Sequence, residues 1–125
     1  MMAAAELLSP AFGRPGGESA ETAGERAIDL AHLSRQTFGD RALESEILEL
    51  FENQARMAAM RLKAASADER KALAHGLKGS ARSIGAFALG DAAAALEHTP
   101  TDSRMLKRLC ERIDQVSDYI SAITR

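Results

Sequence analysis

A histidine on the solvent face of a predicted helix is the residue of this chain best placed to do chemistry. The run from residue 68 to residue 84 has the apolar spacing of a single α-helix. Residues advance by about 100° around a helix, so Leu73, Leu77 and Ile84 fall within roughly 40° of one another and form its buried stripe. His75 lies about 160–200° away from that stripe, which turns its imidazole toward water.

Positive charge and one missing side chain surround this histidine. Lys71, Lys78 and Arg82 lie four residues before, three after and seven after His75, and Gly79 lies four after it. An exposed imidazole is a nitrogen nucleophile that is largely neutral near pH 7, and neighbouring cations favour a dianionic group on its outer nitrogen. Because a glycine leaves the approach open to a second protein, the arrangement suits acceptance of a phosphoryl group by histidine.

The segment AHGLKGSARSIGAFAL, from Ala74 to Leu89, resembles the signature of the histidine-containing phosphotransfer (HPt) domain family. That signature runs His-x-Leu-Lys-Gly-Ser/Ala, followed by a glycine, an apolar position and a Leu-Glu or similar pair. Gly85 and Leu89 match its middle, and Leu96-Glu97 matches its end. The resemblance is clear over residues 74–97 and extends in weaker form over residues 28–125.

The resemblance implies a role for each residue of the site. His75 would be the phosphorylated residue, Lys78 would neutralise the phosphoryl group, and Gly79 would let a receiver domain dock. Glu97 would hydrogen-bond the inner ring nitrogen, so that the outer nitrogen is free to attack. Two further cations are candidates for phosphate or receiver contacts, or else ordinary solvated charges: Lys71 and Arg82.

The same resemblance implies the partners. Members of the family relay phosphoryl groups between receiver-domain aspartates and their own histidine, so response-regulator receiver domains and a hybrid sensor kinase are expected. The receiver would supply the aspartyl phosphate and a bound Mg²⁺, and this chain would need no cofactor or metal of its own. It is therefore expected to be a phosphorelay intermediate carrying a phosphohistidine, and not an enzyme in the usual sense.

Two alternatives to a phosphorelay protein stay open from the sequence. The first is a helical module that binds receivers without accepting phosphate. The second is a kinase-type dimerisation and phosphotransfer domain, which usually carries an acidic residue directly after its histidine, where this chain has Gly76. The chain has no glycine-rich phosphate loop and is too short to hold an ATP-binding kinase domain, so self-phosphorylation from ATP is not expected.

Length and composition limit the other possibilities. The chain has 125 residues, of which 46% are apolar and 4% aromatic, and a net charge of −2. One domain is expected, non-specific nucleic-acid binding is not favoured, and no apolar run reaches the roughly 20 residues needed to cross a membrane. A cytoplasmic monomer is expected, with the lone Cys110 packed in its core.

The chain divides into two parts. Residues 1–27 are expected to form a flexible lead, because glycines and prolines break any regular element there. Residues 28–125 are expected to form the bundle domain. Asp29 is a candidate N-cap of a short helix to about Thr37, Asp40 of a long helix to about Ala65, and Ser66 of the His75 helix, which breaks at residues 83–85. A further helix runs from Ala86 to about His98, and Asp102 or Ser103 caps the last one, which runs nearly to Arg125. The predicted fold is all-α, an up-down-up-down four-helix bundle with a short additional N-terminal helix.

Inward faces are assigned from the apolar spacing. Leu30 and Leu33 are assigned inward in the short helix. The inward residues of the first long helix are taken to be Leu43, Ile47, Leu50, Phe51, Ala58 and Leu62. Met57 and Met60 are taken to fill gaps in the core, or one of them to join a partner-binding surface. His32 and His98 are expected to be plain surface residues.

Overall fold

The structure is a computed structural model that describes residues 26–124. Within this range the chain forms five helices and no strand. The helices are α2 (Leu30–Gln36), α3 (Arg41–Leu62), α4 (Ala67–Ile84), α5 (Phe87–His98) and α6 (Ser103–Ile123). The lead expected for residues 1–27 lies outside the described range except for its last two residues.

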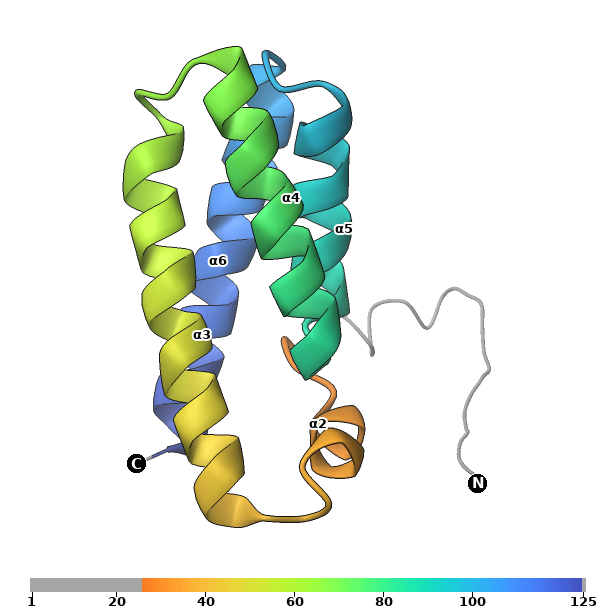
Figure 1. Cartoon of the computed structure of the whole chain (residues 1–125). Helices are drawn as coiled ribbons and strands as arrows, with labels where there is room; N and C mark the ends of the chain where they lie inside the picture. Colours follow the sequence, from red (N-terminus) through yellow and green to blue (C-terminus); the bar gives the residue numbers. More distant parts are fainter. Residues whose placement is uncertain (1–25, 125) are drawn as a thin grey trace.

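The four long helices alternate in direction. Figure 1 shows α3 rising, α4 descending, α5 rising and α6 descending, joined by short connections. The short helix α2 lies at the lower end of the bundle, where it contacts α4. The predicted up-down-up-down bundle with an extra N-terminal helix is therefore confirmed. Over residues 26–124, no helix is both long and apolar enough to cross a membrane.

Side-chain caps begin four of the five described helices, each at a residue that the sequence offers as a candidate, and α5 has no such cap. Asp29, Asp40 and Asp102 each accept a hydrogen bond from backbone N–H groups in the first turn of α2, α3 and α6. Ser66 and Glu69 form a capping box at the start of α4, in which each side chain accepts from the other residue's backbone N–H. Local chemistry therefore sets the start of the helix that carries the candidate site.

Gly85 ends α4 and connects it to α2. Its φ of 93° is left-handed, a conformation that glycine adopts without a steric penalty. Its carbonyl oxygen accepts a hydrogen bond of 2.9 Å from the backbone N–H of Asp29. A Cβ at this position would lie 2.8 Å from the Asp29 carbonyl oxygen, so a larger residue would force the two segments apart.

The buried face of α3 differs in part from the predicted one. Its buried residues are Leu48, Phe51, Ala55, Ala58 and Leu62. Leu43 and Leu50, assigned inward from the sequence, are exposed, Leu50 by 66%. Leu48, Ala55 and Leu62 form a series at seven-residue spacing that faces inward, whereas a parallel series of Leu43, Leu50 and Met57 faces solvent. α3 also ends at Leu62, three residues before the predicted end.

Several smaller assignments are also corrected. Met57 and Met60 fill no core gap, since both side chains are exposed. Leu30 is exposed as well, whereas Leu33 is buried as predicted. Cys110 is half-buried and not a full member of the core, and its partial burial raises the pKa of its thiol.

His32 makes contacts with α4 and α5. Its Nε2 lies 3.1 Å from the carbonyl oxygen of Ser83, and its ring packs edge-on against Phe87 with centroids 5.2 Å apart. These contacts attach α2 to the last turn of α4 and to the start of α5. The prediction of a plain surface residue is therefore wrong for His32, while His98 is exposed as predicted.

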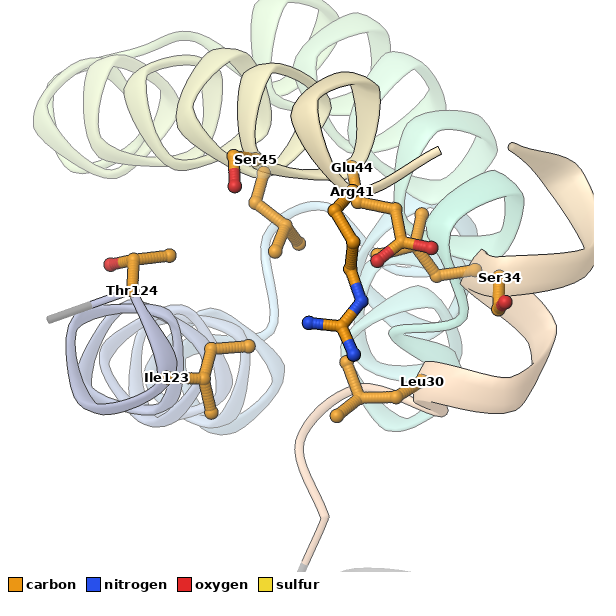
Figure 2. Close-up of a pocket in the computed structure, with 9 residues that line it drawn as sticks. Leu30, Ser34, Arg41, Glu44, Ser45, Ile123 and Thr124 are labelled. Carbon is orange, nitrogen blue, oxygen red and sulfur yellow. The ribbon is translucent and has the colours of Figure 1, made fainter. Parts of the chain in front are cut away.

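A pocket of about 350 Å³ opens at the lower end of the bundle. Figure 2 shows it between α2, the first turns of α3 and the last turn of α6, with the Arg41 side chain extended into it. Leu30, Leu33 and Ile123 contribute apolar walls, and Glu44 lies beside Arg41. None of the predicted site residues lines this pocket, so the candidate chemistry lies elsewhere on the bundle.

Alanine at Gly85 should destabilise the fold, whereas alanine at Gly76 should stabilise it. Gly85→Ala imposes a left-handed φ on a residue with a Cβ and a clash with Asp29, at a cost of about 1–3 kcal/mol. Gly76 lies inside α4 with open space around its Cβ position, so Gly76→Ala should raise the free energy of unfolding by about 0.5–1 kcal/mol. Urea unfolding measures both shifts, and shifts of the same sign would contradict the argument.

Candidate functional site

Helix α4 presents His75 outward because the residues beside it face the core. Ala74 and Leu77 are buried, as are Ala81 and Ile84 further along the same face. The His75 side chain is 68% exposed on the opposite side of the helix. The predicted direction of the imidazole is therefore the one observed.

Glu97 holds the inner nitrogen of the His75 ring. Its Oε2 lies 2.8 Å from Nδ1 of His75, across the interface between α4 and α5. An ionised carboxylate has no proton to donate, so Nδ1 must be the donor and carry the ring's hydrogen. In the neutral ring, Nε2 is then left with its lone pair facing solvent.

The second oxygen of the same carboxylate binds Lys78. Nζ of Lys78 lies 2.7 Å from Oε1 of Glu97, and both side chains are largely covered. Two hydrogen bonds hold the pKa of the Glu97 carboxyl below its usual value: the one from Lys78 has the larger effect, and the one from His75 the smaller. The carboxylate therefore stays ionised at neutral pH and can accept from both donors.

The pairing of Lys78 with Glu97 is not visible in the sequence. From the helix pattern alone, Lys78 simply shares the solvent face with His75, one turn further along. The structure instead leaves it half-buried and joined to the neighbouring helix through Glu97. Residues on different helices come together through bundle packing, and their spacing along the chain carries no sign of this contact.

Small residues bring α5 close enough for these contacts. Ala92 and Ala93 are buried between the helices, with Leu89 and Leu96 on the same side of α5. Short side chains allow two helices to pack at a small separation. Glu97 then stands in the last turn of α5, directly beside the middle of α4.

Gly79 leaves the space next to His75 open. The residue is exposed, and a Cβ built at its position meets nothing within 4 Å. Packing inside the bundle therefore gives no reason for a glycine in the middle of this helix, where it costs about 1 kcal/mol relative to alanine. The approach to the outer ring nitrogen is correspondingly clear on this side.

Arg82 and Lys71 are arranged differently from each other. Nη2 of Arg82 lies 3.5 Å from Oδ1 of Asp91, so its guanidinium reaches toward α5. The stem of Arg82 crosses Gly90, where a Cβ would come within 2.9 Å of its Cγ. Lys71 is exposed on the turn before His75. The packing of the Arg82 side chain over Gly90 was not predicted from the sequence. The one signal there is an isolated glycine in an alanine-rich helix.

Together these groups form a surface site for nucleophilic chemistry. The site offers an exposed ring nitrogen with an oriented lone pair, an ammonium group one turn away and an open side. The described residues contain no group of three or more histidine, cysteine, aspartate or glutamate side chains suited to a metal ion. The chain thus presents an acceptor and a cation on the outside of the bundle, accessible to a second protein.

Comparison with known proteins agrees with this geometry. The model of the Hpt domain family matches residues 41–123. The chain is similar to the crystal structure of the histidine phosphotransferase ShpA from Caulobacter crescentus, with 32% identity and a TM-score of 0.68 over 78% of this chain and 90% of that one. No curated protein matches the chain. With the family model covering most of its length and the site on the helix where the signature lies, the chain belongs to the Hpt domain family.

Proposed function

We propose that Nε2 of His75 accepts a phosphoryl group from the aspartyl phosphate of one receiver domain and passes it to an aspartate of another. The chain is a histidine phosphotransfer protein of a phosphorelay by family. The direction of transfer, the donor and the acceptor belong to the proposal. The receiver domain of a hybrid sensor kinase is the proposed donor, and that of a response regulator the proposed acceptor.

The observation that carries the proposal is the bond from Nδ1 of His75 to Glu97. Because the inner nitrogen holds the proton, the lone pair of Nε2 points out of the bundle and is ready to attack. That lone pair forms the new N–P bond while the P–O bond to the aspartate breaks, and the electron pair of the broken bond stays on the aspartate carboxylate. The phosphorylated ring keeps its Nδ1 proton and is therefore cationic, with the Glu97 carboxylate opposite that charge. The reverse step, onto a second receiver, breaks the N–P bond and restores the neutral ring.

The remaining groups help without forming bonds to phosphorus. Lys78 lies one turn from His75, where its ammonium can share the charge of the phosphoryl oxygens. The receiver is proposed to bring the Mg²⁺ that these reactions use, and this chain no cofactor of its own. In this scheme the protein is a phosphorelay intermediate, with most of the catalytic groups supplied by its partners.

Transfer should depend on His75 and on no other histidine. Wild-type protein mixed with a ³²P-labelled receiver domain should acquire label, and His75→Gln should acquire none because it lacks the nucleophile. His98→Gln, which changes an exposed histidine outside the site, is the matched control and should label normally. If the wild type takes label from no receiver domain of the source organism, a receiver-binding module would be favoured over a relay protein.

Removing the Lys78 ammonium should raise the pKa of the Glu97 carboxyl and slow transfer. In the wild type, the contact between Lys78 and Glu97 stabilises the fold at pH values above the usual pKa of a glutamate. This stabilisation is lost as the pH falls through the lowered pKa of Glu97 in the folded state. The stability difference between wild type and Lys78→Ala should therefore shrink on acidification. Carbon-13 NMR titration of Glu97 measures the pKa, with Lys71→Ala as the control for a nearby exposed charge. An unchanged Glu97 pKa in Lys78→Ala would remove Lys78 from the network.

A long side chain at Gly79 should block receiver docking without harming the bundle. Gly79→Gln places bulk in the open space beside His75 and should lower the rate of transfer strongly. Gly79→Ala adds a single carbon and should lose far less, while both variants gain helix propensity by up to about 1 kcal/mol. Transfer rates alongside urea midpoints separate access from stability. Equal rates in the two variants would contradict the access argument.

A further inference from the structure

Arg70 makes three hydrogen bonds to main-chain carbonyls from one guanidinium group. Its Nε donates to the oxygen of Leu62 at 2.8 Å, its Nη2 to that of Lys63 at 3.0 Å, and its Nη1 to that of Pro100 at 3.2 Å. The side chain is half-buried, and the planar group with its several N–H donors suits such a set of acceptors.

These carbonyls lie at two separate breaks in the chain. Leu62 and Lys63 are the last residue and the cap of α3, where carbonyls have no partner within the helix. Pro100 lies in the turn between α5 and α6. A side chain from the first turns of α4 therefore joins the end of α3 and the end of α5 to the helix that carries His75.

The position of Pro100 connects this clamp to the site. Pro100 follows Glu97 by three residues, and Glu97 is in the last turn of α5, where helices tend to fray. Arg70 precedes His75 by five residues on the same helix, about 7–8 Å along its axis. One guanidinium thus links the helix that carries His75 to the turn that follows Glu97.

We propose that Arg70 is a positioning residue for phosphotransfer, acting by holding the end of α5 so that Glu97 stays against Nδ1 of His75. This inference rests on the proposed function. Without the clamp, the last turn of α5 loosens and Glu97 leaves the ring for part of the time. The ring proton then moves to Nε2 in a larger share of molecules, and a protonated Nε2 has no lone pair with which to attack phosphorus.

The test uses Arg70→Gln in the full chain, with Arg70→Lys as a second variant. Lysine keeps the charge and can reach one carbonyl at a time, so it should fall between wild type and glutamine and also serves if Arg70→Gln folds poorly. The matched control is Arg104→Gln, since Arg104 lies on α6 just beyond the same turn and contacts the carboxylate of Asp102. Arg104→Gln should behave as wild type in every measurement.

Two measurements report on the site itself. Nitrogen-15 NMR of His75 gives the fraction of rings protonated at Nε2, which should rise in Arg70→Gln. Single-turnover transfer from a phosphorylated receiver should slow by about 10-fold at saturating receiver, since misplacement by about 1 Å can cost on the order of 100-fold. The receiver concentration at half-maximal rate should stay the same, because Arg70 is not among the residues around His75 and Gly79 that are proposed to meet the receiver.

Distinct results would overturn the inference and the proposed function. A loss of stability in Arg70→Gln with unchanged His75 protonation and an unchanged transfer rate well below the unfolding temperature would make Arg70 purely structural. A shift only in half-maximal receiver concentration would also reject a positioning role. If wild type itself accepts no phosphoryl group, the proposed function fails, while the nitrogen-15 signals still decide whether Arg70 holds Glu97 against the ring.

Discussion

A single carboxylate shared by two donors is the interaction on which the site depends. Glu97 accepts from Nδ1 of His75 through one oxygen and from Nζ of Lys78 through the other. Both bonds favour the charged carboxylate, as the lowered pKa of Glu97 reflects. Because that group stays ionised, the imidazole must direct its proton inward and its lone pair outward. The orientation of the nucleophile thus follows from a charge on the neighbouring helix.

This contact constrains the bundle around it. α5 must approach α4 closely, which buried Ala92 and Ala93 allow, and its last turn must remain formed. At the lower end, Gly85 ends α4, and its carbonyl oxygen accepts a hydrogen bond from Asp29, the residue before α2. At the upper end, Arg70 joins α4 to the turn after α5. The site lies on the outer surface of α4, and the contacts of Gly85 and Arg70 hold the two ends of that helix.

Features that depend on residues close together in the chain were predicted from the sequence better than features that depend on contacts between helices. Helix starts at Asp40, Ser66 and Asp102 were predicted well, because a cap is made within a few residues of the chain. The inward face of α3 was wrong at Leu43 and Leu50, because two apolar stripes compete on that helix. Which stripe is buried depends on the neighbours that cover it, and the spacing along one helix does not contain that information.

The sequence by itself determined the all-helical bundle, the outward direction of His75 and the resemblance that led to the family, since all of these depend on local periodicity and a short motif. Tertiary structure alone decided that Lys78 pairs with Glu97, that Arg82 crosses Gly90 toward Asp91, and that Arg70 holds the turn at Pro100. Each of these contacts joins α4 to a residue of α5 or of the turn after it. They form because α4 packs against α5 and the turn that follows it at one particular separation and rotation, which depends on the whole core and not on any single segment.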